Sequence, residues 1–560
     1  MRQLAVIRST SDDASPAGRA GRRRTGALLI GVLALVASAV VGCSSGGDGS
    51  DGGGATDQAP DPAASADISA EAIEQLGYAS TGWATLHGDP ANRKYQADAT
   101  AAAAYDSSSA LADTSVLAAP SSGTDGQLYV TTGLPEGSAN LHAFDRDGDL
   151  LWESEPWAGD DGVDPCALLN TPVVDDDGDL YVSDCDQLWS YTADGDVAWV
   201  LDLPAPPADS PYADNPLQPN SFLTAALVGG DRVAGITLYG QVVVVDRETG
   251  ELAAEVLDLP SVPSARAEDP PLPPGALGNG EVDPQIIDVV WQVAFGGSVV
   301  SANTPAASAD GRLFVVAGAD DPTTGVVYGL DVGDDAVDIA FETPVGVGSG
   351  CSPTLSPDEG ELYTCDAAGT LYALGTDDGE VHWKVDDAEA EAGSVAVGPD
   401  GTIYLLVRNG TYRAYEDDGT LRWDADFSTL DDPLPDNADV GPKVLIGAGN
   451  PTVIDGGDRL IAALNRGYQY EIAGRTPNVP VLAELVELDA TTGEALQTLT
   501  PLDNPTEGII HVDPDGTIVS SQGAITTSSL ASLSPMIDPL LTDGLTVIPP
   551  GGGLQIFRPT

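Results

Sequence analysis

The stretch Ala143-Phe144-Asp145-Arg146-Asp147-Gly148-Asp149-Leu150-Leu151-Trp152 holds the pattern that decides the fold. An apolar run ends in Asp, a turn with Gly follows, and a second apolar run ends in Trp four residues after the Gly. Apolar runs on both sides of an Asp-Gly turn predict an antiparallel hairpin. The Gly–Trp spacing recurs at Gly195 and Trp199, Gly379 and Trp383, and Gly419 and Trp423. Gly250 and Gly493 hold the same place with Ala254 and Gln497 instead of Trp.

A second motif, of the form G-x-L-Y-V, precedes these hairpins. It occurs at Gly126–Val130, Gly178–Val182, Gly311–Val315, Gly360–Thr364 and Gly401–Leu405. Units of four short strands that repeat every roughly 40–50 residues are typical of β-propeller blades. Two longer gaps contain Pro-rich insertions, around Leu259–Val282 and Phe427–Gly441. Counting the units predicts an all-β, eight-bladed propeller of four-stranded antiparallel blades, with seven blades as the alternative.

The last unit lacks one strand. Its recognisable strands are Ile509–Val512 and Leu554–Phe557. We expect Trp83–His87, from the other end of the propeller, to pair beside the C-terminal strand and complete the blade. Such an exchange closes the ring and removes the open sheet edges that invite aggregation.

The run from Ala143 through Gly148 to Trp152 resembles the tryptophan-docking repeat of PQQ-like, or quinoprotein-dehydrogenase-like, propellers. Trp83 followed by His87-Gly88-Asp89-Pro90-Ala91-Asn92 resembles the opening segment of many members. The resemblance covers roughly residues 80–560. It implies a structural role, packing between blades, for the docking-motif tryptophans Trp152, Trp199, Trp383 and Trp423.

The resemblance is specific for architecture and leaves activity open, because non-enzymatic lipoproteins share the repeat. Alcohol-oxidising members typically have adjacent cysteines beside the quinone and a calcium ion held by carboxylate and amide side chains. This chain has no Cys-Cys dipeptide. No residue matches the quinone-stacking Trp or the catalytic Asp. We therefore assign no catalytic residue and expect no cofactor, neither PQQ nor calcium.

Other candidate chemistry is weak. An EF-hand loop starting at Asp145 would need Gly at its sixth position and Glu at its twelfth, where the chain has Leu150 and Pro156. We interpret this segment and Asp175–Asp179 as hairpin turns, with opportunistic cation binding as the alternative. The histidines are scattered and none pairs at metal-ligand spacing: His87, His142, His382 and His511. No G-x-S-x-G motif occurs.

The N-terminus predicts export. A basic region with Arg19, Arg22, Arg23 and Arg24 directly precedes the apolar run Thr25–Val41, which is short for a transmembrane helix. The run ends in Val40-Val41-Gly42-Cys43, which resembles a bacterial lipobox. The resemblance implies that residues 1–42 are a signal peptide and that acyl chains on Cys43 anchor the protein to the outer face of the cell membrane. An ordinary signal peptide is the alternative, and Arg23-Arg24 leaves the export route open.

Composition sets the domain boundaries. Residues 43–78 contain mainly Gly, Ser, Asp, Ala and Pro after the lipidated Cys, and we expect a flexible tether. Residues 79–560 are assigned to the propeller. Hydrophobic residues make up 42% of the chain, which is enough for a core.

The four cysteines after Cys43 form two close pairs, Cys166 with Cys185 and Cys351 with Cys365. If the hairpins are centred between Asp175 and Asp176 and on Asp358, the members of each pair face one another across two strands. We predict two disulfides, which persist in exported proteins and contribute about 3 kcal/mol each. A four-Cys metal site is disfavoured because no C-x-x-C spacing occurs.

The charge excludes one class of partner. With 22 Lys and Arg against 87 Asp and Glu, the net charge is −65, which repels the phosphates of nucleic acids. Such acidity suits high external salt, where screening shortens the range of self-repulsion to a few Å. We favour a halophilic or salt-tolerant source over a dedicated cationic partner.

These observations favour a non-catalytic binding or scaffolding module of the cell envelope. Its expected partners are the bilayer, through Cys43, and an envelope protein or other extracellular ligand. The alternative is a propeller enzyme, a quinone-dependent oxidoreductase or a hydrolase, that uses the central channel. Convergent polar groups at the channel mouth would favour the enzyme, and residues that plug it would favour the binding module.

Overall fold

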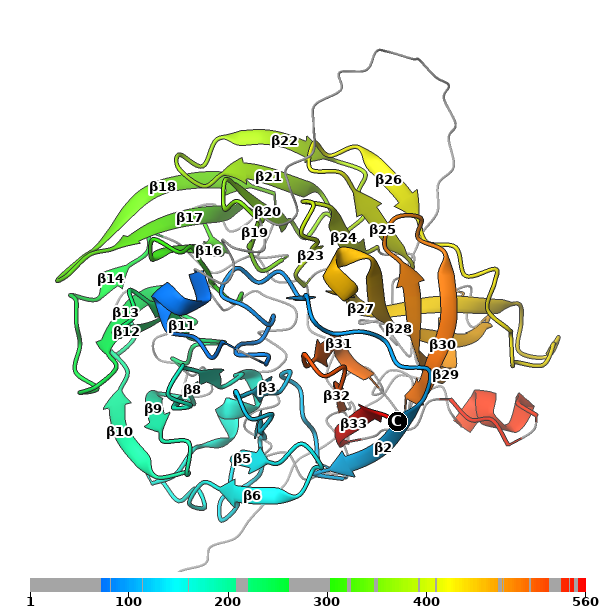
Figure 1. Ribbon diagram of the computed structural model, residues 1–560, viewed down its shortest axis with the longest axis horizontal. Helices are drawn as coiled ribbons and strands as arrows, with labels where there is room; N and C mark the ends of the chain where they lie inside the picture. Colours follow the sequence, from blue (N-terminus) through cyan, green and yellow to red (C-terminus); the bar gives the residue numbers. More distant parts are fainter. Residues whose placement is uncertain are drawn as a thin grey trace, which may run out of the picture.

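The computed structural model shows a ring of eight β-sheets, or blades, with almost no helix (Figure 1). It describes residues 72–560 except for 81, 113, 160, 208–219, 261–302, 320–323, 347–350, 391–392, 408–409, 472–475, 477, 503–504, 523–534, 543 and 548–551. The predicted signal peptide, Cys43 and nearly all of the tether lie outside the described residues. So does most of the insertion around Leu259–Val282.

Blades 1 to 4 follow one another along the chain. Blade 1 comprises β3 (Ser121–Ser122), β4 (Leu128–Thr131), β5 (Leu141–Phe144) and β6 (Leu150–Glu153). Blade 2 comprises β7 (Val173–Val174), β8 (Leu180–Ser183), β9 (Gln187–Tyr191) and β10 (Val197–Asp202), with η1 (Pro165–Leu169) before it. Blade 3 comprises β11 (Ala226–Val228), β12 (Arg232–Ile236), β13 (Gln241–Asp246) and β14 (Leu257–Asp258). Blade 4 comprises β15 (Ala306–Ala307), β16 (Arg312–Gly318), β17 (Gly325–Val332) and β18 (Val337–Val345).

Blades 5 to 8 complete the ring. Blade 5 comprises β19 (Thr354–Leu355), β20 (Glu361–Cys365), β21 (Leu371–Gly375) and β22 (Val381–Val385). Blade 6 comprises β23 (Ala396–Val397), β24 (Ile403–Leu406), β25 (Tyr412–Tyr415) and β26 (Leu421–Asp424). Blade 7 comprises β27 (Lys443–Ile454), β28 (Arg459–Gln469), β29 (Asn478–Asp489) and β30 (Ala495–Leu502), with η2 (Asp455–Gly457) and a short parallel strand, β1 (Tyr95–Gln96). Blade 8 comprises β31 (Pro505–Val512), β32 (Ile518–Gln522), β33 (Gly553–Pro559) and β2 (Tyr105–Ala110), with η3 (Asp538–Leu540) between β32 and β33.

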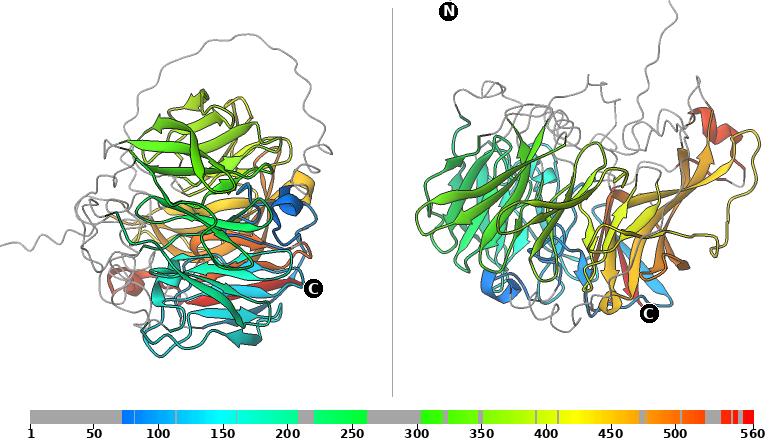
Figure 2. Two further views of the ribbon diagram at one scale, coloured as in Figure 1. Left: turned by 90° about the vertical axis from the view of Figure 1, so that its left-hand side faces the viewer. Right: turned by 90° about the horizontal axis from the view of Figure 1, so that it is seen from above.

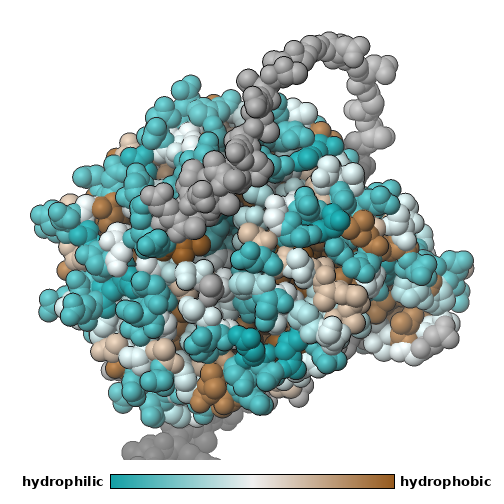
Figure 3. Space-filling model, viewed as in Figure 1, coloured by the Kyte–Doolittle hydropathy of each residue, from teal (hydrophilic) through white to brown (hydrophobic). Residues whose placement is uncertain are grey.

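Position within a blade decides the composition of each strand. The second and third strands of blade 1, β4 and β5, are buried throughout, whereas its outer strand β6 is mainly exposed. The second and third strands have neighbouring blades on both faces and are therefore mainly apolar, as strands covered on both faces are. Outer strands lie at the rim, and Figure 3 shows a largely hydrophilic surface on one side of the ring.

The two ends of the described chain close the ring, but not through the segment expected. Strand β2 pairs antiparallel with β33, from Tyr105 opposite Pro559 to Ala110 opposite Leu554. The expectation that Trp83–His87 would fill this place is wrong. Trp83 is almost fully buried near the axis, where it pairs with an inner strand instead of an outer one.

The docking-motif tryptophans join neighbouring blades at the rim. Trp152 of blade 1 donates its indole N–H to Ala193 O of blade 2 at 3.1 Å. A Cβ on Gly195 would lie 2.6 Å from the same ring, so only glycine fits there. The same contacts occur between Trp199 and Gly250, Trp383 and Gly419, and Trp423 and Gly493.

No helix among the described residues is long and apolar enough to cross a membrane.

Candidate functional site

The axial segment, residues 77–80 and 82–96, crosses the centre of the ring before the first blade begins (Figure 1, blue). Its backbone hydrogen-bonds to the innermost strands of six blades, at Ser122, Val174, Ala307, Leu355, Val397 and Val453. The hydroxyl of Tyr78 accepts from Leu227 N in blade 3, and the ring of Trp83 stacks on His511 in blade 8, 5.3 Å away. The segment therefore contacts the inner strands of all eight blades.

A buried polar group fixes the position of Trp83. Its backbone N–H donates to Ser122 Oγ at 2.7 Å, and that hydroxyl donates to Asp513 Oδ1 at 2.5 Å. His511 Nε2 also lies 2.8 Å from Asp513 Oδ1. Burial alone would raise the pKa of Asp513, but the charge and hydrogen bond of His511 and the bond from Ser122 hold it below its usual value.

Ser122, His511 and Asp513 match the composition of a catalytic triad but not its geometry. In a triad, the His contacts Asp through Nδ1 and Ser through Nε2. Here His511 Nε2 faces both groups, while Nδ1 lies 3.1 Å from Pro120 O. The ring is also fully buried, so the arrangement joins blade 1 to blade 8 and does not activate a nucleophile.

Three further side chains of the axial segment meet the polar groups that precede the inner strands. The ammonium of Lys94 donates to Ser394 O at 2.7 Å, and Asn92 Nδ2 donates to Pro353 O at 2.9 Å. His87 Nε2 lies 3.2 Å from Ser352 Oγ. Burial lowers the pKa of Lys94 to about 7, and burial together with the charge of Lys94 lowers the pKa of His87 well below its ordinary value.

The described residues on the axis do not fit a quinone cofactor. Trp83 is 1% exposed, because its ring is covered by His511 and by the backbone of Gly88. The two disulfides join cysteines 19 and 14 residues apart, so neither is the vicinal pair that such enzymes place beside the quinone.

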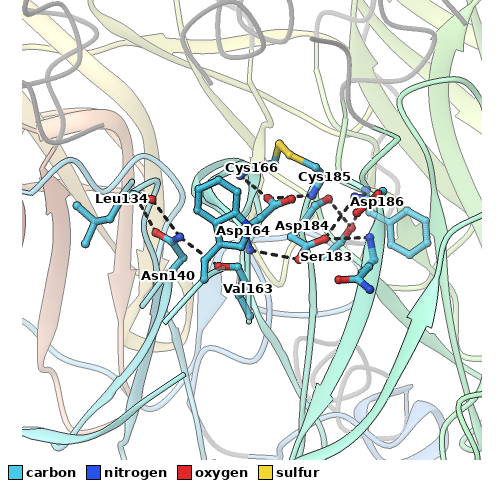
Figure 4. The surroundings of a disulfide bond; sticks show 12 residues. Leu134, Asn140, Val163, Asp164, Cys166, Ser183, Asp184, Cys185 and Asp186 are labelled. Atoms are coloured by element: carbon cyan, nitrogen blue, oxygen red, sulfur yellow. Dashed lines mark hydrogen bonds between the residues drawn. A yellow bond between two sulfur atoms is a disulfide. The ribbon is translucent and has the colours of Figure 1, made fainter. Parts of the chain in front are cut away.

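A second polar cluster surrounds the disulfide of blade 2 (Figure 4). Carboxylate oxygens of Asp164, Asp184 and Asp186 lie within 4.8 Å of one another, and no other group of described residues in blade 2 brings three carboxylates so close. Asp164 Oδ1 accepts from the backbone N–H of Cys166 and Cys185, at 2.8 and 3.1 Å. The cluster thus ties η1, which contains Cys166, to the loop after β8.

Burial and like charge act on this cluster. Burial, followed by the charge of Asp184, raises the pKa of Asp164 to about 8. Burial also raises the pKa of Asp184 to about 6, although the indole N–H of Trp189 donates to this carboxylate at 2.7 Å. Both shifts favour the protonated carboxyl, more strongly at Asp164 than at Asp184.

The predicted disulfides are both present, with Cys166 joined to Cys185 and Cys351 joined to Cys365. The hairpin register used to predict them is wrong. Val174 pairs with Leu180, so the first hairpin is centred on Asp177, and Cys166 lies in η1 instead of a strand. Leu355 pairs with Leu362, which moves the second hairpin by half a residue. The turn-forming aspartates were therefore located correctly, but not their pairing.

The remaining sequence candidates are structural. Asp145 Oδ1 accepts from the backbone N–H groups of Asp147 and Asp149, as in a hairpin turn. His142 is buried beside Thr132 Oγ1, and burial lowers the pKa of its imidazole to about 4. His382 is exposed and pairs with Glu361 at 2.7 Å. Among the described residues, no two of the four histidines share a metal-binding group.

Sequence reasoning missed Lys94 and Asp164. Lys94 carried a signal, because it is one of only three lysines in a chain that otherwise uses Arg as its cation. Nothing in the sequence indicated Asp164, because it is one of 87 acidic residues. Only the folded structure brings it next to Asp184 and Asp186.

The fold is similar to that of known proteins. A quinohemoprotein alcohol dehydrogenase from Comamonas testosteroni is 14% identical and has a TM-score of 0.53, over 89% of this chain and 84% of that one. BamB from Moraxella catarrhalis is 14% identical with a TM-score of 0.43, over 81% of this chain and 98% of that one. At 14% identity, the similarity to the dehydrogenase concerns the fold alone. No curated protein matches the chain.

A family model described as outer membrane protein assembly factor BamB matches residues 92–266 and 337–532. The two stretches cover more than half of the chain. They include the end of the axial segment, blades 1 to 3 and most of blades 5 to 8. The chain therefore belongs to this family of PQQ-like propellers.

Proposed function

We propose that this protein is a non-catalytic binding module of the cell envelope, exported and anchored to the outer face of the membrane through acylated Cys43. The observation that carries the proposal is the axial segment, whose own side chains occupy the place where a propeller enzyme would need open space. The protein would then act through its outer surfaces and loops, as a scaffold for a protein partner.

The contacts of the axial segment support this role. Tyr78, Trp83 and Lys94 are each no more than 2% exposed, and the backbone around them bonds to the blades. Opening this end of the axis would break hydrogen bonds to six inner strands at once, and each group left buried without a partner would cost about 1–3 kcal/mol. A ligand could therefore displace the segment only at a large cost in free energy.

The family supports the location. The matching model is named for an assembly factor of outer membrane proteins, which works in the cell envelope. The signal-like N-terminus and the lipobox-like run ending in Cys43 agree with such an address. The two disulfides fit an oxidising compartment outside the cytoplasm.

The address is tested by mass spectrometry of the full-length protein from membranes. The expected N-terminal peptide begins at Cys43 and carries acyl chains. Cys43→Ser should leave uncleaved precursor or release soluble protein, whereas the control Ser45→Ala should stay in the membrane fraction. An unmodified N-terminus at another position would contradict the anchor.

The binding role is tested separately from the address. The purified full-length chain is incubated with PQQ and calcium and assayed with alcohols. We expect no turnover and no bound quinone absorption. In parallel, a cross-linker attached to exposed residues of the outer strands should give, in intact cells, a defined adduct with one envelope protein. Turnover that is lost on mutating axial residues would instead favour the enzyme.

A further inference from the structure

The Pro-rich insertion Phe427–Gly441, between blades 6 and 7, forms the wall of a pocket. The proposed envelope role does not involve this pocket. Residues 427–434 lie against the start of β27, and between them is a pocket of about 340 Å³. Its apolar wall consists of Phe427, Leu430, Leu434, Val444 and Leu445. Blade 7 has the longest strands of the ring, shown in yellow and orange in Figure 2, and the pocket lies at the end of β27 where Lys443 begins the strand.

One buried cation in this pocket has spare hydrogen-bonding capacity. The side chain of Arg466 is only 3% exposed, and its Nε donates to Glu484 on the neighbouring strand. Its Nη2 has no hydrogen-bond partner among the described residues. A guanidinium N–H that is buried without a partner is uncommon, because the group loses its hydration without compensation.

A β-bulge lies opposite Arg466 on the neighbouring strand. The pairing of β28 with β29 shifts register between Arg466 and Gly467, which is a β-bulge. The extra residue is Val481 of β29, so the bulge alters the backbone that faces Arg466 and Gly467. Bulges are frequent next to functional sites. Gly467 is needed for the close approach, because a Cβ there would lie against the backbone of Val479.

A second cation lies at the same pocket. Lys443 lines it and pairs with Asp432 at 2.9 Å and with the exposed Asp436 at 3.2 Å. Burial would raise the pKa of Asp432, but its hydrogen bond to Lys443 and the charges of Lys443 and Arg466 hold it below its usual value. Two of the 22 cations of a chain with a net charge of −65 thus meet at one apolar pocket.

We propose that this pocket binds a monocarboxylate with an apolar tail, the carboxylate accepting from Arg466 Nη2 and the tail lying against Phe427 and Leu434. A carboxylate suits one free guanidinium edge, to which it makes short charge-assisted hydrogen bonds. Asp432 and Asp436 beside Lys443 disfavour a dianion such as phosphate. The carboxylate is supplied either by a free organic acid or by the C-terminus of an apolar peptide.

The test is calorimetric titration of the purified full-length protein with hexanoate and, separately, with hexanamide. Hexanoate should bind and hexanamide should bind roughly tenfold to a hundredfold more weakly, because the charge-assisted bond is lost. An apolar tripeptide with a free C-terminus is then compared with its C-terminal amide. Tighter binding of the free tripeptide than of hexanoate assigns the peptide source, and the reverse order assigns the free acid.

Removing Arg466 alone would leave Glu484 buried without its partner, so the variant is the pair Arg466→Met with Glu484→Gln. Binding of hexanoate should fall by roughly tenfold or more in this variant. The matched control is Arg459→Met with Glu487→Gln, which removes an ion pair of 3.3 Å between the same two strands, outside the pocket, and should leave binding unchanged.

Equal affinities for hexanoate and hexanamide would overturn the proposal, since Nη2 would then be satisfied by water alone. Unchanged binding in the Arg466 and Glu484 variant would overturn it as well. Thermal unfolding of both double variants shows whether each is folded. Neither result bears on the mature N-terminus or on the absence of turnover, so failure here is distinguishable from failure of the proposed function.

Discussion

The axis and the rim of the ring are held together in different ways. At the axis, one segment that occurs once in the chain contacts all eight blades, largely through backbone bonds and buried polar side chains. At the rim, a local contact of a Trp on a turn Gly repeats at four seams between blades. The axial contact is therefore shared by the whole ring, whereas each rim contact serves only two blades.

The rim also varies more than the axis. Between blades 4 and 5, Phe341 takes the place of Trp against Gly379. Between blades 3 and 4 a polar contact is present, in which Arg232 donates to Gly333 O and pairs with Asp334 at 3.3 Å. Neighbouring blades can therefore pack through different side chains at the rim, because the axial segment holds their inner strands at the centre.

The largest expected effect comes from removing the axial segment. Deleting residues 44–96 should abolish cooperative folding, because the loss of contacts to eight blades exceeds the whole stability of a typical domain, about 5–15 kcal/mol. Deleting residues 44–71 is the control and should leave the melting temperature unchanged. Thermal melts followed by circular dichroism decide the matter. If both proteins melt alike, the axis does not hold the ring.

A single rim contact should matter less. Gly493 has a φ of +72°, and a Cβ there would lie 2.5 Å from the ring of Trp423. Gly493→Ala should therefore destabilise the protein by about 2–4 kcal/mol in urea unfolding, from backbone strain and overpacking together.

Two comparisons isolate the ring contact. Gly456→Ala, also in blade 7, has a similar φ of +63° but meets nothing within 4 Å, so it should cost only about 1 kcal/mol. In a Trp423→Ala background, Gly493→Ala should cost the same small amount. A Gly493→Ala cost that persists without the indole would show that docking on the glycine is unimportant.

Buried ionisable groups should give the axis a pH dependence of its own. Lys94 has a folded pKa lowered to about 7, against about 10.4 when unfolded. Between these values the unfolded chain holds more protons than the folded chain, so stability rises with pH. Lys94→Met should flatten the rise measured by urea unfolding between about pH 8 and 9.5.

The acidic pair of blade 2 should act in the opposite direction. The pKa of Asp164 is raised to about 8, so from about pH 4 to 8 the folded chain holds the extra proton and stability falls as the pH rises. Asp164→Asn should remove this fall without affecting the rise due to Lys94. The prediction is wrong if Lys94→Met leaves the rise in stability at alkaline pH unchanged and Asp164→Asn leaves the fall at lower pH unchanged. These groups would then ionise as they do in the unfolded chain.

The smallest change in stability is expected from a change in salt concentration. Screening of a net charge of −65 should stabilise the rim, where acidic side chains are exposed, by about 1 kcal/mol between low and molar salt. Sodium and potassium chloride should act equally in thermal melts. A strong response to micromolar calcium alone would instead indicate specific sites in the Asp-Gly turns.

Contacts at the rim could be predicted from the sequence, whereas contacts at the axis could not. The rim is local in the chain, so the spacing from Gly148 to Trp152 and its repeats predicted the blades, their number and the closed ring. The axis is not local. Inner strands such as β7 have only two residues, and the partners of Trp83 lie in blades that are far away in sequence. Trp83 was therefore recognised as important but assigned to the wrong strand.

The candidate sites show the same limit. Cysteine pairing was predicted because the members of each pair are close in sequence and bracket a turn, even though the hairpin register was off. The pocket at Arg466 depends on a bulge, on an ion pair to Glu484 and on the fold of the insertion after blade 6. The Pro-rich insertion was visible in the sequence, but nothing in it indicated which cation it would cover.

The pairing of β2 with β33 has a consequence for the order of folding. Ala104 and Thr560, which hydrogen-bond beside this pair, are 456 residues apart. Chains are synthesised at about 5–20 residues per second, so the early strand emerges tens of seconds before its partner exists. During that interval β2 has an unsatisfied edge, and such an edge is prone to pair with other chains. The last step of maturation is then the locking of the ring by the final strand, and contacts this distant in sequence form slowly.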